Sequence, residues 1–219
     1  QKESYIMRNA LEEFVKEFDK ATPVTKQWLL LYDKIYQNRT ASNENSEIAL
    51  VHKEKILPNS MQKKALNNLQ ELRNEGANKA LLISATGTGK TYLSAFDVAA
   101  FNPSKCLYVV HRRNIAEAAM KTFKNVIGQN KSYGLYSGDK REIEADFLFT
   151  TIQTMSRESN LNQFKADHFD YIIVDETHRA GAESYLRVIE YFDAQFLLGM
   201  TATPERTDGL DIFSLFDHN

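Results

Sequence analysis

The chain has 219 residues, of which 42% are hydrophobic and 26% are charged, values that are ordinary for a globular protein. Its apolar runs are only a few residues long, which excludes a membrane-spanning helix, and its first residues lack the apolar core of a signal peptide. The net charge of −2 gives no bulk attraction for nucleic acid, so any such contact has to come from a local basic surface.

The chain contains a single cysteine, Cys106, which lies in an apolar run. A disulfide within the chain and a thiolate metal site are therefore both excluded. We expect a reducing, cytoplasmic location. The chain starts with Gln1 rather than methionine, which suggests a processed product or an excised fragment.

Residues 1–50 differ in pattern from the rest of the chain. Met7, Leu11, Phe14 and Phe18 recur at helical spacing, and a second helical pattern follows Thr22-Pro23. Residues 38–46 are polar and aperiodic, which is typical of a loop. We predict that residues 1–50 form a helical extension or the end of an upstream domain.

From about Ile56 onward, apolar runs alternate with amphipathic patterns, which is typical of an α/β fold with a mostly parallel sheet between helices. This predicts one α/β domain over residues 51–219. The expected strands cover residues 79–84, 106–111, 147–150, 171–175 and 196–200, with a weaker candidate at 132–135. The expected helices cover residues 61–74, 91–101, 115–126 and 184–192.

A glycine-rich turn follows the first of these strands and reads Ala-Thr-Gly-Thr-Gly-Lys-Thr over residues 85–91. A strand that breaks into a turn ending Gly-Lys-Thr is typical of a phosphate-binding P-loop (Walker A), whereas the alternative is a plain surface turn. Glycines let backbone N–H groups approach phosphate oxygens, Lys90 adds charge, and the Thr91 hydroxyl is placed to bind Mg²⁺. Ala85 replaces the first expected glycine, which the turn tolerates if Ala85 keeps a negative φ. The predicted triphosphate-binding residues are Thr86, Gly87, Thr88, Gly89, Lys90 and Thr91.

An acidic pair, Asp175-Glu176, ends the apolar run 171–174. Ligands of open α/β sheets bind beyond the carboxyl ends of the strands, so this pair is expected to face the same crevice as the P-loop. Asp175 can hold Mg²⁺ through its water shell, and Glu176 can orient and deprotonate an attacking water. Two solvated carboxylates at a strand end are the alternative.

The last apolar run ends in Thr201-Ala202-Thr203-Pro204. Two hydroxyls on a turn at the carboxyl end of a strand can hydrogen-bond to the acidic pair and report its state elsewhere. A plain turn stabilised by threonine hydroxyls has the same local sequence. A functional role for this turn therefore depends on the P-loop, the acidic pair and the two threonines occurring in this order along the chain.

These motifs resemble those of the first RecA-like (helicase ATP-binding) domain of superfamily 2 helicases of the DEAD/DEAH-box group, most of all the type III restriction enzyme Res-subunit kind. The resemblance covers about residues 56–211, with residues 85–91 as motif I, Asp-Glu-Thr-His at 175–178 as motif II and Thr201 and Thr203 in motif III. It implies that His178 couples the nucleotide site to motif III and to a second RecA-like domain. Lys90, Asp175, Glu176, His178, Thr201 and Thr203 are the catalytic residues that it implies.

Gln62 stands where the family has its Q motif, so the resemblance implies that its amide reads the adenine edge and favours ATP over GTP. On the sequence alone, Gln62 can equally lie in the first turn of a helix capped by Asn59 or Ser60.

Two further segments match the nucleic-acid motifs of the family, Ia at residues 110–114 and Ib at residues 150–154. The resemblance implies sugar–phosphate contacts without sequence readout. A solvated loop is the alternative for the arginines. The candidate contacts are His111, Arg112, Arg113, Thr151 and Gln153.

Together the motifs predict the ATP-binding motor domain of a DNA-dependent ATPase that uses ATP and Mg²⁺, either a helicase or a translocase on double-stranded DNA. The sequence has no Gln-x-x-Gly-Arg-x-x-Arg segment to supply an arginine finger, so we expect this chain to bind Mg-ATP but hydrolyse it slowly. A non-catalytic ATP-binding scaffold of a restriction complex and an RNA helicase stay open as alternatives. A small GTPase is disfavoured because Asn130-Lys131 is not followed by the aspartate of a guanine reader.

Overall fold

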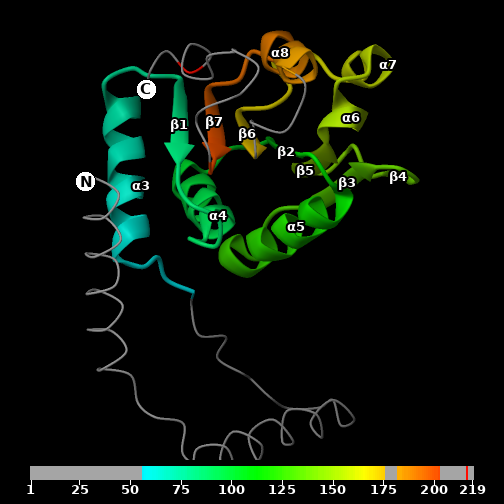
Figure 1. Ribbon diagram of the computed structural model, residues 1–219. Helices are drawn as coiled ribbons and strands as arrows, with labels where there is room; N and C mark the ends of the chain where they lie inside the picture. Colours follow the sequence, from blue (N-terminus) through cyan, green and yellow to red (C-terminus); the bar gives the residue numbers. More distant parts are fainter. Residues whose placement is uncertain (1–55, 176–181, 203–215, 217–219) are drawn as a thin grey trace, which may run out of the picture. The chain divides into compact units, whose positions relative to one another are not determined.

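The computed structural model describes residues 56–175, 182–202 and 216 (Figure 1). The helical extension predicted over residues 1–50 lies outside them and stays a prediction. Among the described residues, no helix combines the length and the apolar character needed to cross a membrane.

Within the described part of the chain, seven strands form one sheet in the order β1-β7-β6-β2-β5-β3-β4. Every neighbouring pair is parallel except β3 and β4. The predicted α/β fold with a mostly parallel sheet is thus confirmed. The strands are β1 (Lys79–Ile83), β2 (Cys106–Val110), β3 (Tyr133–Ser137), β4 (Lys140–Arg141), β5 (Phe147–Thr151), β6 (Tyr171–Asp175) and β7 (Phe196–Thr201).

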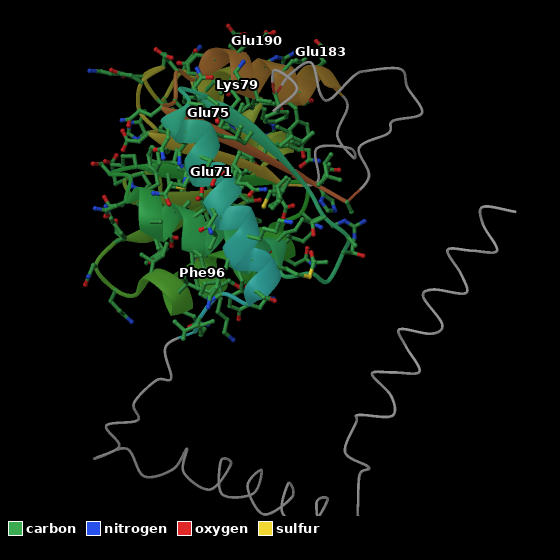
Figure 2. All side chains as sticks on the ribbon, turned by 90° about the vertical axis from the view of Figure 1, so that its left-hand side faces the viewer. Glu71, Glu75, Lys79, Phe96, Glu183 and Glu190 are labelled. Carbon is green, nitrogen blue, oxygen red and sulfur yellow. The ribbon has the colours of Figure 1, made fainter. Side chains whose placement is uncertain are left out.

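Helices cover both faces of the sheet (Figure 1). One face packs against α3 (Ser60–Asn74), α4 (Lys90–Phe101) and α5 (Arg113–Ile127). The other packs against α6 (Ile152–Met155), α7 (Glu158–Leu161) and α8 (Ala182–Tyr191). The helix α3 is amphipathic: it buries Leu69, while Glu71 on its outer side and Glu75, which caps its C-terminus, are exposed (Figure 2).

The side chains of each strand alternate between the two hydrophobic cores, as the pleat requires. In β6, Tyr171 and Ile173 belong to the core beneath α3, α4 and α5. Ile172 and Val174 belong to the core beneath α6, α7 and α8. By the same alternation, Asp175 at the end of β6 lies on the α4 side of the sheet.

A buried ion pair joins α3 to α4 and to the sheet. Both terminal nitrogens of the Arg73 guanidinium donate to the Asp97 carboxylate, at 2.9 and 2.8 Å. The Tyr171 hydroxyl donates to the same carboxylate, and the guanidinium lies 4.8 Å from the ring centroid of Phe196. These contacts satisfy a carboxylate that would otherwise be costly to bury.

Gly199 in β7 makes room for an aromatic ring. A Cβ at this position would lie 2.4 Å from the nearest ring atom of Phe216, which is fully buried. Glycine is therefore required in mid-strand because of this close approach, and not because of an unusual φ.

Candidate nucleotide site

The P-loop connects the end of β1 to the start of α4. Gly87 and Gly89 have φ values of 82° and 83°, a left-handed conformation that glycine adopts at no steric cost. Among the described residues, only Asn102 is a non-glycine with positive φ. Ala85 therefore has the negative φ that a residue other than glycine needs at this position of the turn. Gly89 immediately precedes the first turn of α4, whose unpaired N–H groups favour an anion.

Hydrogen bonds within the P-loop fix its shape. The Ser84 and Thr88 hydroxyl oxygens lie 2.7 Å apart, and the Thr88 hydroxyl donates to the Ala85 carbonyl at 2.8 Å. The Lys90 ammonium group donates to the carbonyls of Ser84 and Ala85, at 2.8 and 3.1 Å. Lys90 is therefore held over the loop, where it supplies a positive charge beside the backbone N–H groups.

The Tyr108 phenol lies near both Asp175 and the first turn of α4. Asp175 is 6% exposed, and its carboxylate accepts a hydrogen bond of 3.0 Å from the buried Tyr108 hydroxyl. Burial and the nearby Asp175 charge raise the pKa of Tyr108 well above its ordinary value, while the neighbouring Thr91 and Ser94 hydroxyls act in the opposite direction. The two predicted magnesium ligands, Thr91 and Asp175, thus both lie near the Tyr108 phenol.

The donor set fits a hard cation, since a hydroxyl and a carboxylate both offer oxygen. Within the described ranges, no three His, Cys, Asp or Glu side chains gather into a metal cluster. Mg²⁺ is usually held by one or two protein oxygens together with substrate phosphates.

The end of β7 lies directly beside the P-loop. Thr201 pairs with Ile83 across the sheet, and its carbonyl accepts a hydrogen bond of 3.0 Å from the Ser84 backbone N–H. The Thr201 residue is fully buried. Three other predicted catalytic residues, Glu176, His178 and Thr203, lie outside the described residues.

Gln62 forms a capping box with Asn59 at the start of α3 and also reaches the P-loop. Its amide oxygen accepts from the Asn59 backbone N–H at 3.0 Å, and its amide nitrogen donates to the Gly89 carbonyl at 3.2 Å. An amide oxygen can accept two hydrogen bonds and an amide nitrogen can donate two. Both roles predicted for Gln62 are therefore compatible. Beside it lies a hollow of about 170 Å³ between α3, β1 and the P-loop.

The candidate nucleic-acid contacts follow the carboxyl ends of β2 and β5. Arg113 is committed to carboxylates, Asp139 at 2.6 Å and Glu117 at 3.0 Å. The Arg112 side chain is exposed and makes no ion pair with any other described residue. Arg112 and Arg113, which the sequence does not distinguish, thus differ in the structure: Arg113 is held in ion pairs, and Arg112 is exposed.

The other candidate nucleic-acid contacts differ in accessibility. Thr151 is buried, with its hydroxyl oxygen 2.9 Å from that of Thr154. Gln153 is exposed in α6, and His111 is half-buried after β2. Of these three side chains, Gln153 is therefore the most accessible to a ligand.

Tyr108 was missed by sequence reasoning. Its position inside a fully buried strand indicates a core residue, and nothing in the local sequence relates it to Asp175. The only available signal was that a hydroxyl lies in an otherwise apolar run, since a buried phenol usually needs a hydrogen-bond partner.

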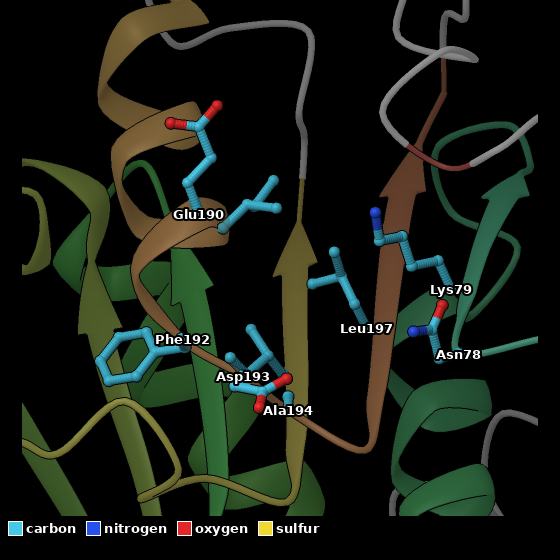
Figure 3. A pocket seen from close by; sticks show the side chains of 9 residues that line it. Asn78, Lys79, Glu190, Phe192, Asp193, Ala194 and Leu197 are labelled. Atoms are coloured by element: carbon cyan, nitrogen blue, oxygen red, sulfur yellow. The ribbon is translucent and has the colours of Figure 1, made fainter.

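A second hollow, also of about 170 Å³, lies at the opposite end of the sheet (Figure 3). It is lined by the start of β1 and β7 and by the end of α8, including Asn78, Leu197 and Glu190. It is therefore separate from the P-loop crevice.

Known proteins share both the sequence pattern and the fold. The chain is 28% identical over 160 residues to the Type I restriction enzyme EcoAI endonuclease subunit of Escherichia coli, a match covering 68% of the chain and 20% of that protein. It is 30% identical over 147 residues to the putative mitochondrial ATP-dependent helicase irc3 of Schizosaccharomyces pombe, covering 62% of the chain and 24% of that protein. The chain thus spans less than a quarter of the length of these relatives.

The SWI2/SNF2 ATPase core of Sulfolobus solfataricus, solved in complex with double-stranded DNA, has a similar fold. Its TM-score is 0.58 at 16% identity, over 77% of this chain and 37% of that one. Residues 55–206 match the family model described as "Type III restriction enzyme, res subunit". This match covers the sheet from β1 to β7 and the whole P-loop, and the chain therefore belongs to the type III restriction enzyme res subunit family.

Proposed function

We propose that this chain contains the ATP-binding motor domain of a DNA-dependent ATPase, a helicase or a double-strand translocase. The observation that carries the proposal is the hydrogen bond from Tyr108 to Asp175, on the face of the sheet that packs against α4, the P-loop helix. It keeps the acidic end of β6 on the same face of the sheet as that helix. A motor of this kind needs that proximity, because both groups act on one nucleotide.

In the proposed mechanism, the P-loop binds the triphosphate through the backbone N–H groups of residues 86–91. Lys90 leaves the loop carbonyls and places its charge against the outer phosphates. Thr91 and Asp175 hold Mg²⁺, which neutralises charge on the phosphate oxygens when it is bound. Glu176 accepts the proton of the attacking water.

The remaining catalytic residues would pass the state of the nucleotide onward. Thr201 is suited to this role because its carbonyl already binds the Ser84 backbone N–H at the start of the P-loop. In this proposal, His178 and Thr203 extend this connection to a second RecA-like domain, which responds to the state of the nucleotide. We also propose residues 51–219 as the motor domain and residues 1–50 as a separate helical extension.

DNA is the proposed partner, since the family and the EcoAI relative are restriction enzymes, whose substrate is DNA. Exposed Arg112 and Gln153 would contact the sugar–phosphate backbone. An RNA helicase is the second candidate, and a non-catalytic ATP-binding scaffold is the third. The Lys90 ammonium held over the P-loop and the Asp175 carboxylate at the end of β6 support a catalytic motor rather than a scaffold.

The test has two parts. Purified chain is expected to bind ATP in a Mg²⁺-dependent way, and Lys90→Ala is expected to weaken that binding about 10- to 100-fold, as for loss of a hydrogen bond to a charged group. The full-length protein is expected to hydrolyse ATP faster with double-stranded DNA than with RNA. Equal ATP affinity of Lys90→Ala and the unchanged chain would contradict the proposed nucleotide site. Stimulation of ATP hydrolysis by RNA alone would contradict DNA as the partner.

A further inference from the structure

We propose that Tyr108 is a positioning residue for the magnesium site: its hydroxyl holds the Asp175 carboxylate toward the first turn of α4. This inference rests on the proposed function. It assigns a role to a residue of β2 that belongs to none of the motifs found in the sequence.

Tyr108 carries the one side-chain oxygen of β2. The strand reads Cys-Leu-Tyr-Val-Val and is buried at every position. Tyr108 pairs with Ile173 in the register of β2 and β6. Its side chain points to the α4 side of the sheet, where its oxygen lies 3.0 Å from the Asp175 carboxylate.

The ring of Tyr108 is fixed by two neighbours, so the hydroxyl has little freedom to move away. Phe149 stacks on it with 5.4 Å between ring centroids, and Phe123 meets its edge at the same distance. A ring held on two sides directs its hydroxyl to one place. Tyr108 therefore sets the orientation of Asp175 rather than following it.

Two side chains of α4 complete the arrangement. The Thr91 and Ser94 hydroxyls lie near the Tyr108 phenol, where they oppose the rise in its pKa. The Ser94 hydroxyl also donates to the Thr91 carbonyl at 3.0 Å. The phenol that binds Asp175 therefore lies beside the first turn of α4, which carries the other predicted metal ligand.

A packing role alone would make a different prediction. Replacing Tyr108 by Phe keeps the ring and its aromatic neighbours, and removes one oxygen atom. If only packing matters, nucleotide binding changes equally with and without Mg²⁺. If the hydroxyl orients Asp175, the change is confined to Mg²⁺-dependent binding.

The experiment measures the affinity of the chain for a fluorescent ATP analogue across Mg²⁺ concentrations and in EDTA. Tyr108→Phe is expected to raise the Mg²⁺ concentration for half-saturation about tenfold, the lower end of the effect of losing an outer-shell partner. Affinity in EDTA is expected to stay within about twofold, since the hydrogen bonds of Ser84, Thr88 and Lys90 that shape the P-loop are untouched.

Tyr136→Phe is the matched control. Tyr136 is buried on the other side of the sheet, and its hydroxyl accepts a hydrogen bond of 2.9 Å from Gln163. This variant also loses one hydrogen bond from a buried tyrosine, so it should match Tyr108→Phe in thermal stability while keeping the Mg²⁺ dependence of the unchanged chain. In an Asp175→Asn background, Tyr108→Phe should cause no further change, because the two act through one contact.

The outcomes separate the inference from the proposed function. Equal Mg²⁺ half-saturation for Tyr108→Phe and the unchanged chain would overturn the inference alone. Equal weakening with Mg²⁺ and in EDTA would also overturn it, because this is the result of a packing defect. If the unchanged chain shows no Mg²⁺-dependent binding, the proposed function fails and the inference fails with it.

Discussion

The side-chain amide of Gln62 donates a hydrogen bond to the backbone carbonyl of Gly89, with 3.2 Å between nitrogen and oxygen. A Cβ at Gly89 would lie 2.8 Å from the same nitrogen. Gln62 is only 8% exposed and also belongs to the capping box of α3. One side chain thus joins the start of α3 to the second glycine of the P-loop.

The first prediction separates the two roles of Gln62. Gln62→Ala removes half of the capping box, so we expect the free energy of unfolding to fall by about 1 kcal/mol. If the amide also reads adenine, the preference for ATP over GTP disappears. Urea unfolding and competition binding measure the two effects.

Asn59→Ala is the control for this prediction. It removes the side chain that accepts from the Gln62 backbone N–H, and should cost about the same stability while keeping the nucleotide preference. If the unchanged chain binds ATP and GTP equally, the adenine role of Gln62 is wrong.

The second prediction distinguishes Arg112 from Arg113. In a plot of log affinity for double-stranded DNA against log salt concentration, Arg112→Ala should reduce the slope by about 1, because one phosphate contact is lost. Arg113→Ala should leave that slope unchanged, since its guanidinium is paired with Asp139 and Glu117. An effect of Arg113 equal to that of Arg112 would contradict this assignment.

The third prediction concerns the close contact between Gly199 and Phe216. Gly199→Ala inserts a methyl group where the ring lies 2.4 Å away, so we expect a loss of about 1–3 kcal/mol in the free energy of unfolding from overpacking. Adding Phe216→Leu should recover part of that loss, because a smaller side chain leaves room for the methyl group. Additive losses in a double-mutant cycle would show that the two positions do not interact.

The fourth prediction concerns Cys106. Burial raises the pKa of this thiol far above its ordinary value, so the folded chain should react slowly with a thiol reagent at both pH 7 and pH 9. Denatured chain should react faster at pH 9, since an exposed thiol ionises near pH 8.5. Equally fast reaction of folded and denatured chain at pH 9 would contradict the buried placement.

The sign of the effect on stability follows from the same pKa shift. The folded state holds the Cys106 proton more tightly than the unfolded state does. The contribution of Cys106 to the free energy of unfolding is therefore full below the ordinary thiol pKa and falls as the pH rises above about 8.5.

The sequence predicted those helices and strands that are long enough to show a hydrophobic period of their own. The strand expected at 171–175 is β6 with the same bounds, and the helix expected at 61–74 begins one residue earlier as α3. Helix α4 also begins one residue earlier than expected, at Lys90. The weaker strand candidate at 132–135 is displaced to Tyr133–Ser137.

Three elements were not predicted because each is too short to show a period. Strand β4 has two residues, and α6 and α7 have four each. Next to β4, the Glu142 carboxylate accepts a hydrogen bond of 2.9 Å from the Leu135 backbone N–H of β3, a side-chain contact that hydrophobic periodicity does not indicate.

Within the candidate site, the P-loop could be read from its own seven residues, whereas its partners could not. Tyr108 and Asp175 are 67 positions apart, and Gln62 and Gly89 are 27 apart. The first pair becomes visible only once the strand order is known, because it requires β6 to lie beside β2. The second pair requires the packing of α3 beside the P-loop, which the sequence pattern does not give.

The alternation of side chains along β6 makes the chain unevenly tolerant of changes in length. Deleting or adding one residue within Tyr171–Asp175 would rotate the terminal carboxylate to the α8 side and leave a valine facing the P-loop helix. The same change in the connection between α7 and β6 could be absorbed without moving Asp175. Length variation among natural relatives should therefore concentrate in that connection and spare the strand.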